Sequence, residues 1–148
     1  MITGIENIAD LTNTRNSWAE YLNKFQWEWY FTLTFDKKTS IRTAYRKFYK
    51  WKNWLKKALG DKVRYFLIAE QPRYKGDNIH FHGFIQGIKD EKPYKWKQTW
   101  HSLSGISDIQ SYDKTQGASY YLSDKIVYKE SDIRHSQDLN EIKSSKEN

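Results

Sequence analysis

Two runs of strand-forming residues lie close together near the middle of the chain, and their spacing restricts the folds that it can adopt. Residues 63–71 read VRYFLIAEQ and residues 78–86 read NIHFHGFIQ, and both runs are rich in β-branched and aromatic side chains. The linker between them, PRYKGD, contains a proline, a glycine and an aspartate, which favour a turn. We therefore predict an antiparallel β-hairpin.

Other elements flank this hairpin on both sides. Hydrophobic periodicity predicts a helix at 17–25, a strand at 27–35 and a long amphipathic helix at 39–59 before it, and a helix at 94–103, a strand at 106–112 and a closing helix at 118–129 after it. Without the first and last helices the order is βαββαβ, which is that of a ferredoxin-like split sheet. We predict an α+β fold in which helices pack on one face of an antiparallel sheet, with additional N- and C-terminal helices.

The length of 148 residues fits one domain, which we place at residues 1–130. Residues 131–148 are mostly polar, and we expect them to form a mobile tail. The chain has no cysteine, so disulfides and thiolate metal sites are excluded. The first ten residues lack the pattern of a signal peptide, and no apolar stretch is long enough to span a membrane. We expect a cytoplasmic protein.

Basic residues are concentrated in and around the predicted long helix. Between residues 37 and 64 there are eleven lysines and arginines and one acidic residue, and the whole chain has a formal net charge of +7. Tryptophan and tyrosine are interspersed with these cations, a combination that suits single-stranded nucleic acid because phosphates attract cations and unpaired bases stack on rings. The alternative is that the lysines only solvate the outer face of a helix. The residues that we expect to contact DNA are Arg42, Arg46, Lys50, Arg73 and Lys75.

Two histidines interrupt the second strand of the hairpin. His80 and His82 project to the same side of a strand, and the apolar residues between and around them project to the other. Glu70 ends the preceding strand, and an antiparallel return would bring it beside the histidines if the register places it on their face. Such a group could bind Mg²⁺ or Mn²⁺ and leave ligand positions open. The alternative is that the two histidines are structural or merely exposed.

The closing helix carries a candidate nucleophile. Tyrosine can act as a covalent nucleophile, and Tyr121 shares a helical face with Lys125, four residues later. Tyr120 points about 100° away from Tyr121 on the helix, so we expect it to face another surface. The alternative is that these tyrosines only pack, since the chain has eleven of them.

Three short motifs together resemble those of the HUH endonucleases, in particular the rolling-circle replication initiators (Rep proteins) of small viruses and plasmids. They are FTLTF at residues 31–35, HFH at 80–82 and YLSDK at 121–125, in the order in which the family has them. The resemblance implies that a metal ion on Glu70, His80 and His82 orients a phosphate of single-stranded DNA at a replication origin. Tyr121 would then attack, leaving a 5′-phosphotyrosine and a free 3′-hydroxyl, and the reverse reaction would rejoin the ends. Lys125 would stabilise charge on the phosphate.

The sequence departs from the family pattern in two respects. Many relatives have a lysine three residues after the tyrosine, whereas here Asp124 holds that place and Lys125 follows, which leaves Tyr120 as an alternative nucleophile. The chain also lacks the helicase domain of larger members, so a host or separate helicase and a polymerase are expected partners. A relaxase or tyrosine transposase of the same superfamily is a further possibility.

Two other classes of protein compete with this interpretation. A non-catalytic module with a split sheet could bind single-stranded nucleic acid through the same basic and aromatic residues. It would give no reason for the histidine pair. A cupin-like metal enzyme would require many more strands than the sequence predicts.

Overall fold

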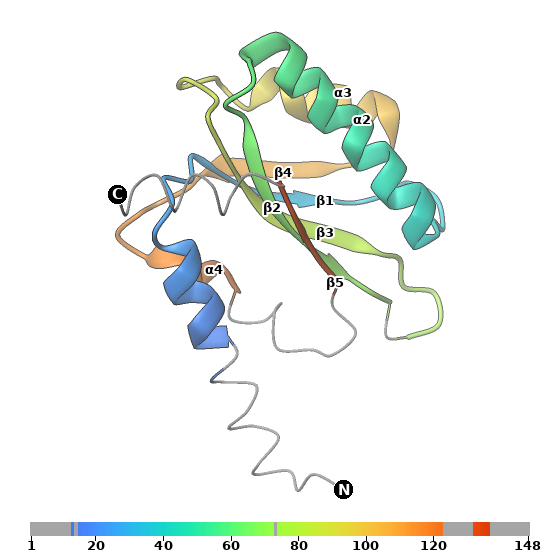
Figure 1. Ribbon diagram of the computed structural model, residues 1–148. Helices are drawn as coiled ribbons and strands as arrows, with labels where there is room; N and C mark the ends of the chain where they lie inside the picture. The colour runs from blue at the N-terminus through green and yellow to red at the C-terminus, as the bar shows by residue number, and fades with distance from the viewer. Residues whose placement is uncertain (1–12, 14, 73, 123–131, 137–148) are drawn as a thin grey trace, which may run out of the picture.

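The structure is a computed structural model that describes residues 13, 15–72, 74–122 and 132–136 (Figure 1). A helix at residues 15–22 is followed by β1 (Trp29–Leu33), α2 (Ile41–Leu59), β2 (Arg64–Glu70), β3 (His80–Gln86), α3 (Tyr94–Leu103), β4 (Ser107–Ser111), α4 (Gly117–Leu122) and β5 (Asp132–His135). The helices and strands predicted up to α4 are present in the predicted order. None of the described helices combines the length and the apolar composition needed to cross a membrane.

The five strands form one antiparallel sheet in the order β4-β1-β3-β2-β5. Strands β2 and β3 form the predicted hairpin, in which Arg64 pairs with Gln86 at one end and Glu70 pairs with His80 at the other. The α+β fold with a split βαββαβ sheet is therefore confirmed.

Helices cover both faces of this sheet (Figure 1). On one face, Phe81 and Ile85 of β3 belong to a large core that also contains the buried residues of α2 and α3. On the other face, Phe84 belongs to a smaller core with residues of the 15–22 helix and of α4. The sequence analysis placed the histidines on an open face. The terminal helices in fact cover the end of that face around Phe84, while His80 at the other end remains half-buried.

The long helix α2 has well-defined ends. The Ser40 hydroxyl caps its first turn by accepting a hydrogen bond from the Thr43 N–H at 3.2 Å. Gly60 ends it with a φ of 112°, a conformation that a residue with a side chain would rarely adopt. Its buried face consists of Ala44, Tyr45, Phe48, Trp51 and Leu55.

Gly83 allows the three central strands to pack closely beside His82. A Cβ atom at this position would lie 2.2 Å from the carbonyl oxygen of Phe66 and 2.6 Å from the ring of Phe31. The first of these atoms belongs to the backbone of β2 and the second to a fully buried ring, so neither can withdraw easily. The close approach helps to fix where His82 stands in the sheet.

Strand β5 corrects the expectation of a polar tail from residue 131. Residues Asp132–His135 pair with β2 and form the edge of the sheet. The Tyr45 hydroxyl donates a 2.6 Å hydrogen bond to the Asp132 carboxylate, and the Arg134 guanidinium lies 4.1 Å from the centre of the Tyr45 ring. Burial, followed by this hydrogen bond, raises the pKa of Tyr45, so it remains a donor at neutral pH. Residues 137–148 of the predicted tail lie outside the described residues.

Candidate functional site

Glu70, His80 and His82 come together at one end of the β2–β3 hairpin. Glu70 pairs directly with His80, and His82 stands two residues further along β3, opposite Ile68. One potential ligand atom from each of the three residues lies within 4.8 Å of the others. The register therefore places Glu70 on the face of the histidines, which the sequence alone did not determine.

The donor atoms of this group suit a divalent cation. Ligands on opposite sides of a common ion at about 2.1 Å each would be about 4.2 Å apart, so a spread of up to 4.8 Å requires only a small contraction. The His82 Nε2 atom lies 2.8 Å from the Glu70 carboxylate, and both atoms would turn toward the ion. Two imidazoles and one carboxylate leave positions open for a substrate oxygen. Metals that accept mixed nitrogen and oxygen ligands fit this group.

Thr32 supports His82 from the neighbouring strand. Its hydroxyl lies 3.2 Å from His82 Nδ1, and the two residues are register partners across β1 and β3. With Nδ1–H donated to Thr32, the Nε2 lone pair faces the Glu70 side, which is the tautomer that a metal ligand requires. The sequence analysis did not assign this role. The alternation in FTLTF puts Thr32 on the second face of β1, but only the register connects it to His82.

A hollow of about 430 Å³ adjoins the group at the hairpin turn. It is lined by Glu70, Gln71, Pro72, Tyr74, Gly76, Asp77, Asn78 and His80. Tyr74 is 74% exposed here, so its ring is available to stack against a base, and Lys75 is exposed beside it. Arg73, also predicted to contact DNA, lies outside the described residues. The hollow offers a place for a nucleotide next to the ligand group.

Tyr121 lies on the same face of the sheet as the ligand group. Its ring centre is 4.7 Å from that of Tyr30 and 5.9 Å from that of Phe84. Phe84 follows His82 by two residues, which corresponds to roughly 7 Å along the strand. Tyr120 is 63% exposed and packs edge-on against Tyr121. Lys125 lies outside the described residues, so the predicted pairing of tyrosine and lysine is not tested.

The Tyr121 hydroxyl is not directed at the ligand group. It accepts a 2.9 Å hydrogen bond from the N–H of Asp113, which follows β4. Asp108 is the residue of β4 that pairs with Thr32, and Asp113 is five positions further along, roughly 16 Å away if the strand spacing continues. The structure thus brings the ring of Tyr121 onto the correct face but holds its hydroxyl toward the opposite end of the sheet.

The neighbours of Tyr121 remain protonated at neutral pH. Burial, followed by the charges of Tyr121 and Asp113, raises the pKa of Tyr112 to about 12. Burial likewise raises the pKa of Tyr30. Both phenols therefore act as neutral packing partners around Tyr121.

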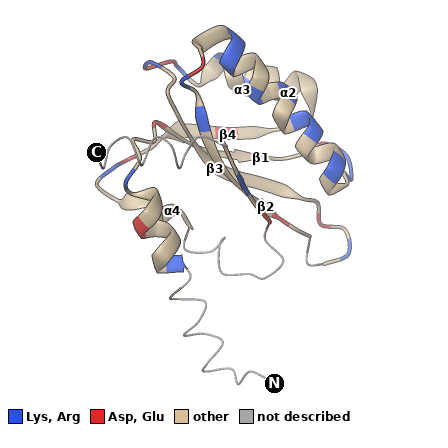
Figure 2. Ribbon diagram, viewed as in Figure 1, with Lys and Arg blue, Asp and Glu red and all other residues tan. Residues whose placement is uncertain are grey.

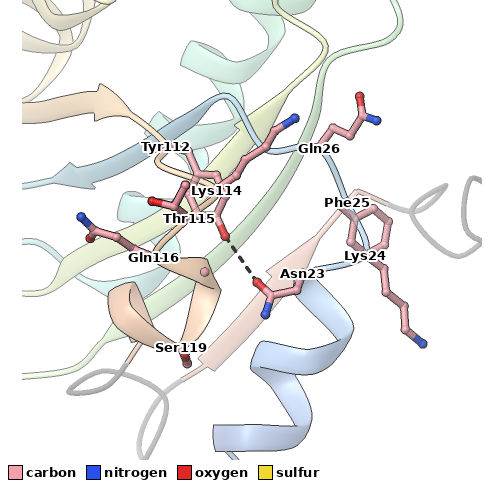
Figure 3. Close-up of a pocket in the computed structure, with 10 residues that line it drawn as sticks. Asn23, Lys24, Phe25, Gln26, Tyr112, Lys114, Thr115, Gln116 and Ser119 are labelled. Atoms are coloured by element: carbon pink, nitrogen blue, oxygen red, sulfur yellow. Dashed lines mark hydrogen bonds between the residues drawn. The ribbon is translucent and has the colours of Figure 1, made fainter.

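The start of α4 is held by Asn23, at the edge of a second cavity of about 600 Å³ (Figure 3). The Asn23 side-chain oxygen accepts hydrogen bonds from the Ala118 N–H at 2.7 Å and from the Tyr112 hydroxyl at 3.4 Å. Lys24, Gln26 and Lys114 also line this cavity. Asn23 thus ties the helix that carries both tyrosines to the end of the 15–22 helix.

Replacing Asn23 with alanine is expected to loosen α4. The Ala118 N–H would lose its acceptor, at a cost of about 1–2 kcal/mol. The backbone amides of α4 should then exchange hydrogen roughly 5–30 times faster, as measured by mass spectrometry or NMR. Gln26→Ala, which removes another side chain lining the same cavity, is the matched control and should leave this exchange unchanged. Equal exchange rates in Asn23→Ala and the parent protein would show that Asn23 does not position α4.

Arg42, Arg46 and Lys50 lie away from this site. All three are exposed on α2, which packs on the other face of the sheet. A strand of DNA bound at Glu70 and His80 would not reach them without passing around the sheet.

The model of the replication-associated protein family of the ORF2 type matches residues 28–129, which is more than half of the chain. The matched span begins just before β1 and extends beyond α4, so it contains the ligand group and both tyrosines. No curated protein and no solved structure matches the chain.

Proposed function

The chain belongs to this replication-associated protein family, which supports a role in replication, and from this premise we propose that it nicks and rejoins single-stranded DNA at an origin. The proposed chemistry is that of an HUH endonuclease, and the nick would initiate rolling-circle replication of a small replicon. The observation that carries the proposal is the grouping of Glu70, His80 and His82 on adjacent strands, on the face that also carries Tyr121.

Glu70, His80 and His82 are the residues that would hold a divalent cation, Mn²⁺ or Mg²⁺. When bound, such an ion supplies positive charge that polarises a non-bridging oxygen of the scissile phosphate. Thr32 keeps the His82 ring in the orientation that this requires. Lys75 and Tyr74, at the hairpin turn, bind the DNA backbone and a base beside the ligand group. Arg73 contributes a further cation there.

In the proposed reaction, the phenolic oxygen of Tyr121 attacks the phosphorus atom. An O–P bond forms to Tyr121, the bond from phosphorus to the 3′-oxygen breaks, the phenol loses its proton to solvent and the departing oxygen gains one. The products are a 5′-phosphotyrosine and a free 3′-hydroxyl that primes synthesis. The reverse transesterification joins ends. Lys125 stabilises the charge on the phosphate during both steps.

This mechanism requires the Tyr121 side chain to move. Its hydroxyl must leave the Asp113 N–H and turn toward the phosphate, and this hydrogen bond is exposed, so its loss costs little. Tyr120 is the alternative nucleophile, because its ring is exposed where that of Tyr121 is packed between Tyr30 and Tyr112.

The test is incubation of the protein with a labelled pool of single-stranded oligonucleotides, with Mn²⁺ or with EDTA. A denaturing gel reports cleavage, and mass spectrometry of the digested protein reports a DNA adduct. The proposal expects a metal-dependent adduct on the peptide that contains Tyr120 and Tyr121. Tight binding across many sequences with neither cleavage nor adduct would instead indicate a non-catalytic module that binds single-stranded nucleic acid.

A further inference from the structure

Helix α2 carries a row of positive charge with no acidic residue in it. The helix has seven lysines and arginines among its 19 residues and no aspartate or glutamate. We define the basic stripe as Arg42, Arg46, Lys50 and Lys57, which are exposed and recur at helical spacing. From Arg42 to Lys57 the stripe spans about 22 Å. Figure 2 shows the basic residues along the length of α2.

The basic stripe has no acidic partner in the part of the chain that the structure describes. Within that part, no carboxylate forms an ion pair with any of its four members. Like charges four residues apart on a helix repel each other by a few tenths of a kcal/mol per pair. A helix with this composition is stabilised when an external polyanion neutralises it, because binding also releases the counterions of that polyanion.

The basic stripe and the ligand group lie on opposite faces of the sheet. Residues of α2 pack in the core that contains Phe81, whereas His82 and Phe84 face the other side, where α4 lies (Figure 1). The single strand proposed to be cut and the partner of the stripe are therefore different segments of nucleic acid.

The surface of α2 suits a phosphate backbone better than unpaired bases. Single strands bind through rings on which their bases can stack. Trp54 is 37% exposed on this helix, but the Lys50 ammonium lies 5.5 Å from its ring centre, and Lys52 similarly covers Tyr49. The rings of α2 are thus occupied by lysines, while the lysine and arginine heads remain available to phosphates. In a duplex the bases are paired, and only the backbone is presented to such a surface.

We infer that the basic stripe binds the backbone of duplex DNA next to the single strand that is nicked. This inference rests on the proposed function for its biological setting, but the contact itself is independent of catalysis. At 3.4 Å per base pair, a stripe of this length faces about six base pairs.

The test compares two variants with the same change in net charge. One is Arg42→Gln, Arg46→Gln, Lys50→Gln, and the control is Lys24→Gln, Lys92→Gln, Lys114→Gln, which removes three exposed cations elsewhere. Affinity for a labelled 20-bp duplex and for a 20-nt single strand is measured by fluorescence anisotropy in EDTA, over a range of salt concentrations. Nicking of a short single strand with Mn²⁺ is measured in parallel.

If the three stripe residues contact phosphates, the dependence of log affinity for duplex on log salt becomes shallower by about 2.7, and duplex affinity near 0.1 M salt falls on the order of 100-fold. The control variant should change both values much less. Equal losses in the two variants would mean that only net charge matters and would overturn the inference. Loss of single-strand affinity with duplex affinity retained would overturn it too. A parent protein that binds duplex through the stripe but never nicks would contradict the proposed function alone.

Discussion

His82→Ala is expected to reduce metal-dependent cleavage of single-stranded DNA on the order of 1,000-fold. The substitution removes one of three ligand atoms, and the stabilisation of transition-state charge by a bound cation is worth several kcal/mol, of which about 4 kcal/mol corresponds to this factor. The measurements are the single-turnover rate of cleavage with Mn²⁺ and the affinity for Mn²⁺ in the absence of DNA. Both should fall, because His82 acts through the metal.

Three further variants show whether the effect belongs to the ligand group. Glu70→Gln retains the shape of the side chain but removes its charge, and should also weaken Mn²⁺ binding. Thr32→Val removes only the hydroxyl beside His82 Nδ1, and should cost about 10–100-fold in metal affinity or rate. His101→Ala removes an exposed imidazole on α3, and should change neither value. A His82→Ala protein that is folded, binds Mn²⁺ as the parent does and cleaves at the parent rate would contradict the assignment of the ligand group.

The sequence was sufficient to predict most of the fold because each element has its own local pattern. The β2–β3 hairpin follows from two alternating runs and a short turn, and α2 follows from apolar residues at helical spacing that stop at Gly60. Strand β5 has no such pattern. It is short and polar, and its contacts are a backbone ladder with β2 and side-chain contacts with Tyr45 on α2, which lies far away in sequence.

The same division applies to the candidate site. The histidine pair could be recognised from the sequence because alternation within one strand fixes the common face of His80 and His82. The orientation of the neighbouring residues could not, since it depends on pairing between strands. The register of β1 with β3 sets Thr32 against His82, and a backbone N–H of Asp113 holds the Tyr121 hydroxyl. A sequence reports which side chains are available, but not which backbone groups meet them.

Tyr121→Phe is expected to abolish both cleavage and the covalent adduct while single-stranded DNA is still bound. Phenylalanine retains the ring that packs against Tyr30 and Phe84, so the core around α4 should persist. It lacks the oxygen that attacks phosphorus, and loss of a covalent nucleophile typically lowers the rate by a factor of about 10⁴ or more. The measurements are the cleavage rate, the mass of the protein after incubation with DNA and Mn²⁺, and the thermal unfolding temperature.

Tyr120→Phe is the matched control, since it makes the same chemical change one residue earlier, on an exposed ring. It should retain cleavage within a fewfold of the parent rate. The opposite result, with Tyr120→Phe inactive and Tyr121→Phe active, would assign the attack to Tyr120 and would make the hydrogen bond from Asp113 to Tyr121 a structural contact. Full activity in both variants and in the double variant would exclude a nucleophile on α4. The position of the Tyr121 hydroxyl makes this comparison decisive, because the geometry puts its ring on the correct face and its oxygen at the wrong end.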